Sequence, residues 1–262
     1  MKNLPKISIV IPSLNKGEFI GETLQSIINQ KYPNLEVIIR DGGSTDTTVE
    51  IIKRFVSKCS YIHWESKKDE GQLMAINRGL AEAKGEIVTF LNADDVYQEG
   101  ALGVVGAYFS KHPKILWLAG KGETIDEYGR KIAPWVDDYK NFLLKLNKYS
   151  WLLTANYFFQ PSVFLSSKAF EKYGPFTGTE TSVMEYDMWL KLGKVEMPKV
   201  LDRPLSSFRL TKGSLSTSEF KSILMADEKI AEKYTANPLL LALHYLHNIG
   251  RVLIVKYLIW GR

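Results

Sequence analysis

Glu86-Ile87-Val88-Thr89-Phe90-Leu91-Asn92-Ala93-Asp94-Asp95 is the stretch that decides the fold. After Glu86 it is a run of apolar and β-branched residues, which is typical of a buried strand. The run then changes abruptly into a polar cluster with two adjacent carboxylates. Because the ligand crevice of an open α/β sheet lies outside the carboxyl ends of its strands, these acids are predicted to lie at such a crevice.

The acid cluster has two interpretations. Oxygen ligands on a short loop suit a hard divalent cation such as Mg²⁺ or Mn²⁺, which keeps open positions for the phosphates of a substrate. The alternative is a polar turn that caps the next helix, because aspartate is common in turns and at helix N-caps. The rest of the chain has to decide between them.

The pattern around this stretch alternates strands with amphipathic helices, which predicts a parallel sheet covered by helices. The predicted strands are 7–12, 35–40, 61–64, 86–91 and 115–119, and the predicted helices are 19–33, 47–58, 71–84 and 100–111. Asp41 follows one strand as Asp94 follows another, which favours a nucleotide or metal site over structural capping. A Gly-x-Gly-x-x-Gly fingerprint after a strand and a P-loop are both absent from the sequence, which argues against a dinucleotide dehydrogenase and a P-loop NTPase.

Composition sets broad limits. The 262 residues suit one large α/β domain, and the formal net charge of +5 favours anionic partners such as nucleotide phosphates, an acidic membrane surface or nucleic acid. Cys59 is the only cysteine, so no intrachain disulfide can form, and a reducing, cytoplasmic setting is the simpler expectation. The chain start carries no apolar signal-peptide core.

Two segments of the C-terminal half have open interpretations. The aromatic-rich segment 134–164 either lines a sugar or lipid acceptor site or belongs to the core. Glu185 and Asp187 open a short predicted helix. Acids in the first helical turn complement the helix dipole, but a carboxylate that faces the crevice could also act as a general base.

The tail 238–262 has a broad apolar face and a narrow polar stripe of His244, His247, Asn248 and Arg251. Arg251 near its middle argues against a membrane-spanning helix, because a central arginine costs about 2.5–3.5 kcal/mol on insertion. An interfacial amphipathic helix with Trp260, Lys256 and Arg262 at its end fits better. Lipid, the catalytic domain or a second subunit could each cover the apolar face.

Taken together, the motifs resemble glycosyltransferase family 2 over roughly residues 5–215. The segments that carry the resemblance are 8–15 (SIVIPSLN), 41–46 (DGGSTD), 69–72 (DEGQ), 77–80 (NRGL), 91–95 (LNADD) and 185–190 (EYDMWL). The resemblance implies the GT-A fold, a Rossmann-like three-layer α/β/α sandwich with a mostly parallel sheet and here a C-terminal helical tail. It further implies a catalytic domain 1–215, with a nucleotide half of about 1–120 and an acceptor half of about 121–215, followed by C-terminal helices 216–262.

The resemblance also assigns roles to matching positions. The nucleotide-binding residues would be Pro12, Ser13, Glu18, Asp41, Gly71, Asn77, Asn92 and Ala93. Asp94 would bind Mn²⁺ or Mg²⁺ with support from Asp95, and Asn92 departs from the usual first aspartate of the Asp-x-Asp motif. Gln160 and Arg209, the latter followed by Ser214, would lie near the donor sugar, acceptor or diphosphate. Glu185 is the favoured base, where relatives commonly have aspartate, and Asp187 is the alternative.

The implied activity is inverting transfer of a sugar from a nucleotide diphosphate sugar to a hydroxyl of a glycan or lipid-linked acceptor. The expected setting is bacterial surface polysaccharide or glycolipid synthesis on the inner face of the cell membrane, with an anionic membrane surface or a homodimer as partners and no nucleic acid. Two alternatives stay open. A sugar-nucleotide nucleotidyltransferase can share the sheet but would use two metals and a more basic N-terminal loop, and a non-catalytic glycan- or nucleotide-binding protein would have lost its activity.

Overall fold

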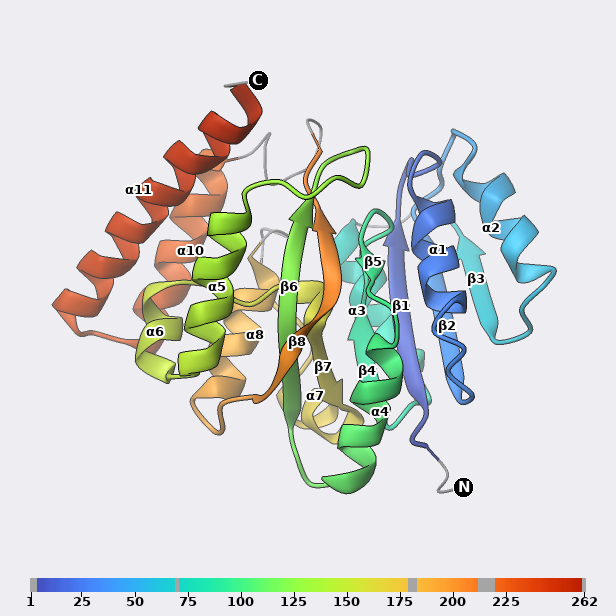
Figure 1. The fold of residues 1–262 in the computed structure, drawn as a ribbon, viewed down its shortest axis with the longest axis horizontal. Coiled ribbons are helices and arrows are strands. Elements are labelled where there is room, and N and C mark those ends of the chain that lie inside the picture. The colour runs from blue at the N-terminus through green and yellow to red at the C-terminus, as the bar shows by residue number, and fades with distance from the viewer. Residues whose placement is uncertain (1–3, 69–70, 179–182, 212–219, 261–262) are drawn as a thin grey trace.

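The computed structural model describes residues 4–68, 71–178, 183–211 and 220–260, without the side chains of 220–222, 224 and 255–260. In this part of the chain, one eight-stranded sheet has helices on both faces (Figure 1). The strands are β1 (Ile7–Ser13), β2 (Leu35–Asp41), β3 (Ile62–Ser66), β4 (Ile87–Phe90), β5 (Val96–Tyr97), β6 (Trp117–Ile125), β7 (Val163–Ser166) and β8 (Lys199–Arg209). The helices are α1 (Ile20–Ile28), α2 (Thr48–Val56), α3 (Gln72–Glu82), α4 (Ala101–Lys111), α5 (Pro134–Leu146), α6 (Tyr149–Thr154), α7 (Ser167–Tyr173), α8 (Met184–Gly193), α10 (Phe220–Tyr234) and α11 (Pro238–Trp260), with a 3₁₀ turn η1 (Gln160–Ser162).

The strand order is β3-β2-β1-β4-β7-β6-β8-β5. The first four strands are parallel, whereas β7 runs antiparallel to both of its neighbours and β5 runs antiparallel to β8. Since β1 pairs with β2 on one side and β4 on the other, the carboxyl ends of these three strands meet at one edge of the sheet. The predicted mixed α/β fold with a mostly parallel sheet is confirmed.

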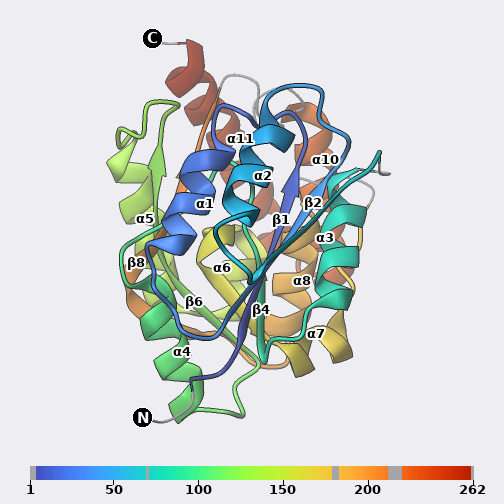
Figure 2. The same cartoon turned by 90° about the vertical axis from the view of Figure 1, so that its right-hand side faces the viewer.

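The strands separate two apolar cores, because successive side chains of a strand point to opposite faces. Ile7, Ile9 and Ile11 of β1 pack in a core shared with α1, α2 and α4, whereas Val10 packs in a second core with α3, α5, α6 and α8. Figure 2 shows α1 and α3 on opposite sides of β1. The predicted three-layer sandwich therefore follows from the near-continuous apolar sequence of the first strand.

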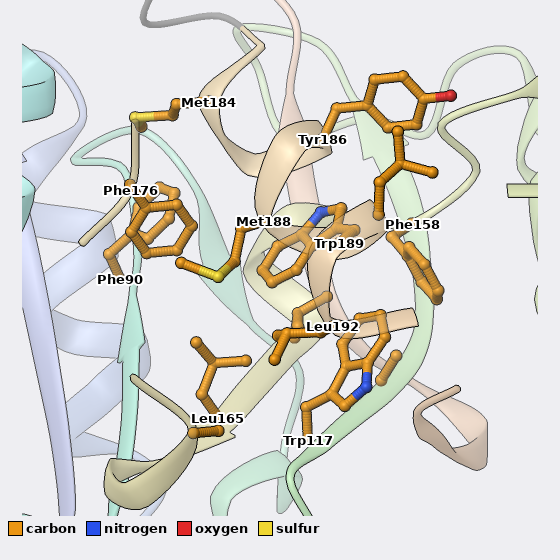
Figure 3. Close-up of a cluster of buried hydrophobic side chains, with 14 of the residues drawn as sticks. Phe90, Trp117, Phe158, Leu165, Phe176, Met184, Tyr186, Met188, Trp189 and Leu192 are labelled. Atoms are coloured by element: carbon orange, nitrogen blue, oxygen red, sulfur yellow. The ribbon is translucent and has the colours of Figure 1, made fainter. Parts of the chain in front are cut away.

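Helix α8 is held by the second core (Figure 3). The Trp189 ring stacks on Trp117 with 5.6 Å between centroids and meets the Phe176 ring edge-on at 6.1 Å. Trp189 is almost completely buried, and burying such a side chain contributes about 1.5–3 kcal/mol to folding. This packing fixes the start of α8, where Glu185 lies.

Helix α11 packs on the domain through its polar stripe. His244 and Asn248 are each only 2% exposed, the His244 ring stacks on Tyr186, and Arg251 pairs with Asp227 of α10. The apolar row faces outward instead: Leu239, Leu243, Leu246, Ile249 and Leu253 are all exposed. No helix within the described ranges combines the length and hydrophobicity that a membrane crossing needs.

Candidate active site

Asp41, at the end of β2, shapes the loop that follows it. Its carboxylate accepts hydrogen bonds from the backbone N–H groups of Gly43 (3.1 Å) and Ser44 (2.9 Å), and from the hydroxyls of Ser44 and Ser66. Four donors use about all the lone pairs that a carboxylate offers. A ligand that contacts Asp41 would therefore have to replace one of the two serine hydroxyls. At the neighbouring end of β1, by contrast, the buried Ser13 Oγ has no hydrogen-bond partner among the described atoms.

Asp94, beyond the end of β4, meets a cation from the loop after β1. The Nζ of Lys16 lies 2.5 Å from Asp94 Oδ2, and the Asp94 side chain is 11% exposed. Lys16 therefore brings positive charge to the position where a divalent cation is predicted. No local sequence pattern indicates this pair, because its members lie 78 positions apart in the chain.

Asp95 points inward and is completely buried. Its Oδ1 accepts from the backbone N–H of Arg209 at 2.8 Å and its Oδ2 accepts from the Asn92 amide at 3.2 Å. Burial and the neighbouring charge of Asp94 raise the pKa of the Asp95 carboxyl well above its usual range. Since both oxygens have partners within the chain, Asp95 is placed to support the loop, and Asp94 is the carboxylate left to face a ligand.

The guanidinium of Arg209 holds this loop from behind. It donates to the carbonyl oxygens of Asp94 (2.8 Å), Asp126 (3.0 Å) and Glu127 (3.2 Å), and it pairs with the carboxylate of Glu22. Arg209 is only 2% exposed, so its contact with the Asp94 loop is through the protein interior. It is therefore a positioning residue in this structure.

The amide side chains predicted near the nucleotide connect neighbouring segments. Asn92 Oδ1 accepts from Gln72 Nε2 at 2.7 Å. Asn77 uses its amide on the backbone of Phe176, donating to the carbonyl oxygen and accepting from the N–H, each at 2.9 Å. Gln160 donates to the carbonyl oxygen of Phe90 at 2.7 Å. Gln160 thereby connects the end of β4 to a large cavity.

The cavity has a volume of about 580 Å³ and lies where α5, α8, α10, α11 and the end of β8 come together. Its wall is formed by Thr124, Ala133, Trp135, Val136, Tyr139, Lys140, Asn156, Phe158, Phe159, Gln160, Glu185, Phe208, Leu210, Ile223, His247, Gly250, Arg251 and Ile254. Most of these side chains are aromatic or aliphatic. Such a cavity, with a few polar groups, has the form of a small-molecule site.

Glu185 lies in the cavity wall and has an altered acidity. Burial, assisted by the charge of Asp227, raises the pKa of its carboxyl from 4.5 to about 8, against the opposing charges of Arg251 and Lys140. A carboxyl with a pKa near neutrality is well matched to proton transfer at physiological pH. Burial in apolar surroundings therefore raises the pKa of Glu185 by more than its position at the helix N-terminus lowers it.

Asp187 has a different environment. Its carboxylate accepts from Thr177 Oγ1 (2.9 Å), Lys233 Nζ (2.8 Å) and Tyr234 Oη (2.9 Å), and Asp187 does not line the cavity. Although burial opposes them, these donors lower the pKa of Asp187 below its usual value. Asp187 therefore connects α8 to α10, and Glu185 is the acid of the two that can reach a ligand.

Residues 8–174, more than half of the chain, match the family model described as Glycosyl transferase family 2. The chain belongs to this family. An uncharacterized glycosyltransferase of Rickettsia felis is 28% identical over 197 residues, which cover 73% of this chain and 32% of that protein. A chondroitin synthase of Escherichia coli is 26% identical over 195 residues, which cover 74% of this chain and 27% of that protein. This family 2 chain spans about a third of the length of the curated relatives it matches.

Solved structures share the fold. The mannosyltransferase PcManGT from Pyrobaculum calidifontis, in complex with GDP-Man and Mn²⁺, superposes with a TM-score of 0.70 at 19% identity, over 99% of this chain and 75% of that one. Residues 1–349 of S. aureus TarS, in complex with UDP-GlcNAc, give a TM-score of 0.63 at 19% identity. The superposition covers 96% of this chain and 72% of that one. The family 2 chain therefore has the GT-A fold that the sequence motifs predict.

The structure brings most of the predicted site residues of this family 2 chain to two places. Pro12, Ser13, Asp41 and the 92–95 loop lie at the common strand edge, while Gln160 and Glu185 lie in the cavity. Glu18 is exposed on the loop after β1, Gly71 has a φ of +105° just before α3, and Ala93 is buried. Asp69, Glu70 and Ser214 lie outside the described residues, as do Arg262 and the side chains of Lys256 and Trp260.

Among the residues of the cavity wall that were not predicted as site residues are two cations, an amide and an imidazole: Lys140, Arg251, Asn156 and His247. Lys140 and Asn156 lie in the aromatic-rich segment 134–164, for which an acceptor site was one of two interpretations, but nothing in the sequence distinguishes these two residues within it. The polar stripe on the otherwise apolar tail was the available signal for His247 and Arg251. The sequence left open whether lipid, the domain or a second subunit covers the apolar face of the tail, and the structure turns the polar stripe toward the domain.

Proposed function

We propose that this chain transfers a sugar from a nucleotide diphosphate sugar to a hydroxyl acceptor with inversion of the anomeric carbon. The observation that carries the proposal is the Glu185 carboxyl, with its pKa near 8, in a cavity that Gln160 connects to the end of β4. Relatives with the same fold were solved with UDP-GlcNAc or GDP-Man, which supports a nucleotide sugar as donor. The pathway we propose is surface polysaccharide or glycolipid synthesis.

In this mechanism the Glu185 carboxylate takes the proton of the acceptor hydroxyl as its oxygen attacks the anomeric carbon. The bond to the nucleoside diphosphate breaks on the opposite face, so no covalent enzyme intermediate is needed. Lys16 is placed to stabilise the negative charge of the leaving diphosphate, because its ammonium already lies at the carboxyl edge of the sheet. Asp95 and Arg209 hold the Asp94 loop in position.

We infer that Asp94 is the residue that would hold the divalent cation, Mn²⁺ or Mg²⁺. Among the described residues, no three His, Cys, Asp or Glu side chains form a cluster that could hold a metal by themselves. A single carboxylate nevertheless fits Mg²⁺-type binding, in which phosphates of the substrate and water complete the coordination. When bound, the cation supplies Lewis-acid stabilisation to the diphosphate leaving group. The Mn²⁺ in the PcManGT structure supports this inference.

A panel of UDP- and GDP-sugars, with and without Mn²⁺, tests the proposed activity against its alternatives. Release of nucleoside diphosphate that depends on the donor sugar supports a glycosyltransferase. Exchange of pyrophosphate with a nucleoside triphosphate would support a nucleotidyltransferase instead. Binding of a nucleotide sugar without release of any product, across acceptors, would support a non-catalytic binding protein.

The rate of sugar transfer should rise with pH between about 6 and 8. Because the pKa of Glu185 is about 8, most of this carboxyl is protonated at pH 6.5 and cannot accept a proton. Deprotonation on raising the pH restores the base, so log kcat should increase by about one per pH unit before it levels off. Asp227 of α10 raises this pKa, whereas Lys140 of α5 and Arg251 of α11 lower it. A flat profile over this range for wild-type enzyme, measured under saturating donor, would contradict Glu185 as base.

We also propose that α11 attaches the chain to the inner face of the cell membrane. Leu246 and Leu253 are each 62% exposed, and leaving such side chains in water forgoes about 25 cal/mol per Å² of apolar area. The intact protein should co-sediment with vesicles that contain phosphatidylglycerol. The double variant Leu246→Glu/Leu253→Glu should stay in the supernatant. Val195→Glu, at a 56% exposed position outside α11, is the matched control and should still co-sediment.

Two results would contradict this attachment. Intact protein that stays in solution with anionic vesicles would do so directly. If the double variant instead changed a stable dimer into a monomer, the leucine row would be a subunit interface. Charge substitutions are preferable to deletion of the tail, because α11 supplies part of the cavity wall and packs on α6 and α10.

A further inference from the structure

The cavity of the proposed active site opens between two helices that both expose apolar side chains. Helix α5 exposes Trp135, Tyr139, Phe142 and Leu146, at a spacing that places them on one face. Trp135 and Tyr139 also line the cavity, so they form part of its opening. Across from them, the Tyr139 ring stacks on His247 of α11, with 6.0 Å between centroids. The opening is thus flanked by α5 and by the helix with the exposed leucine row.

Inside the cavity, the positive charge of Lys140 is not balanced by an ion pair with any described residue. Arg251 pairs with Asp227, but Lys140 has no ion-pair partner among the described residues. Its ammonium lies 3.8 Å from the centroid of the Phe159 ring, a cation–π contact that only partly replaces lost hydration. A cation kept in such apolar surroundings is costly unless an anion joins it. The charges of Asp137 on the same helix and of Glu185 favour the charged form of Lys140, but neither forms an ion pair with it within the described part of the chain. Asp137 does not line the cavity, and Glu185 is largely neutral at pH 7.

The wall also presents buried polar atoms without partners. Asn156 Oδ1, Gln160 Oε1, His247 Nδ1 and Arg251 Nε have no hydrogen-bond partner within the described part of the chain. Buried polar groups in folded proteins are nearly always satisfied, so four such atoms around one cavity indicate a place that a polar ligand occupies. The ligand must therefore combine hydrogen-bonding groups with an anion, while most of the wall around it is apolar.

We propose that the acceptor bound in this cavity is an anionic amphiphile, in which a hydrocarbon chain carries a phosphate close to the hydroxyl that receives the sugar. The phosphate pairs with Lys140 and Arg251, the hydroxyl lies at Glu185, and the chain leaves between α5 and α11 toward the lipid surface. This inference rests on the proposed glycosyltransferase function and specifies its acceptor. A water-soluble glycan would need neither the unpaired Lys140 nor an opening flanked by exposed leucines and aromatics.

The volume and charge of the site agree with this choice. About 580 Å³ lies within the range of about 300–1,000 Å³ that is usual for small-molecule sites, which is enough for the polar end and part of a chain. The formal net charge of +5 favours approach to an anionic lipid surface, from which such an acceptor would arrive. A second copy of the chain could cover the exposed leucines, but it would leave the charge of Lys140 inside the cavity unexplained.

Isothermal titration calorimetry with three probes tests the acceptor class without any turnover. The intact protein is titrated, in EDTA and without donor, with octyl phosphate, octyl glucoside and inorganic phosphate, each below any micelle concentration. Octyl phosphate should bind about tenfold more tightly than octyl glucoside, as expected for one charge-assisted contact. Inorganic phosphate should bind far more weakly than octyl phosphate, because it lacks the chain.

Variants of α5 locate the binding. Lys140→Met should lower the affinity for octyl phosphate about tenfold while leaving octyl glucoside almost unchanged, and Lys140→Arg should restore the preference. Lys145→Met removes an exposed lysine of the same helix and should bind like wild type. Adding UDP or GDP should not displace octyl phosphate, which separates the cavity from the donor site.

Each contrary result overturns the inference. Equal affinities for octyl phosphate and octyl glucoside would show a neutral acceptor site, and an unaffected Lys140→Met variant would place the anion elsewhere. Inorganic phosphate that binds as tightly as octyl phosphate would show an anion site without a lipid chain. Because no donor or metal is present, these outcomes are independent of the nucleoside diphosphate assay. That assay alone decides whether the chain is a glycosyltransferase.

Discussion

Replacement of Asp94 by alanine should lower the rates of both sugar transfer and nucleotide-sugar hydrolysis by about 10³-fold or more. The reason is that a bound metal stabilises the transition state by several kcal/mol. Asp94 is the acid of the 92–95 loop that has an oxygen available to a ligand, because both oxygens of Asp95 have partners inside the protein. The fold should remain intact, since the ion pair that Asp94 makes within the described residues is the partly exposed one with Lys16. Release of nucleoside diphosphate in Mn²⁺-containing buffer is the measurement.

Two companion variants make this result specific. Asp202→Ala also removes a close lysine pair, with Lys121, but at an exposed position away from the cavity wall, and should keep full activity. Asp95→Ala should mainly lower stability, by about 1–3 kcal/mol, because it leaves the buried Arg209 N–H without an acceptor. Near-wild-type turnover of the Asp94 variant would remove Asp94 from the metal site.

Glu185→Gln should lower kcat by about 10²–10⁴-fold while leaving the affinity for the donor almost unchanged. The amide has nearly the same shape but cannot take the proton of the acceptor, so the loss belongs to the chemical step. Residual activity of the variant should no longer rise between pH 6 and 8. Donor affinity from calorimetry, set beside kcat from product release, separates the two effects.

The stability of the same variant provides an independent check on the environment of Glu185. Because the folded-state pKa, about 8, lies above the ordinary value of 4.5, ionisation of Glu185 costs stability progressively as the pH rises through this window. The glutamine variant has no such cost, so its melting temperature should match wild type near pH 5 and exceed it at pH 9. Asp187→Asn should melt below wild type at both pH 5 and pH 9, because, against the effect of burial, Lys233, Thr177 and Tyr234 lower the pKa of the Asp187 carboxyl below its ordinary value of 3.8 and the carboxylate is therefore ionised and stabilising at both. The difference should shrink only as the pH falls below that value. A large loss of kcat in a stable Asp187→Asn variant would exchange the roles of the two acids.

Much of the fold could be predicted from the sequence, because its signals are local. The apolar runs at 7–12, 35–40 and 86–91 and the helical periodicities between them determine a parallel, helix-covered half-sheet. The polar residues that end those runs must then lie at one edge of the sheet, whatever the remaining chain does. The boundaries differ by a few residues: the strand predicted at 115–119 is β6, Trp117–Ile125.

The tertiary structure decided the features that depend on partners distant in the sequence. Periodicity shows that α11 has a polar stripe and an apolar row, but the direction of the stripe is set by Tyr186 and Asp227 on other helices. The same holds for the two acids of α8: Asp187 meets Lys233 and Tyr234, while Glu185 meets a cavity. A carboxylate next to charged donors stays ionised and structural, and one in apolar surroundings holds its proton until near pH 8. The sequence by itself determined which residues stand at the ends of strands and helices, and only packing between distant segments decided the charge and the partners that each of them has.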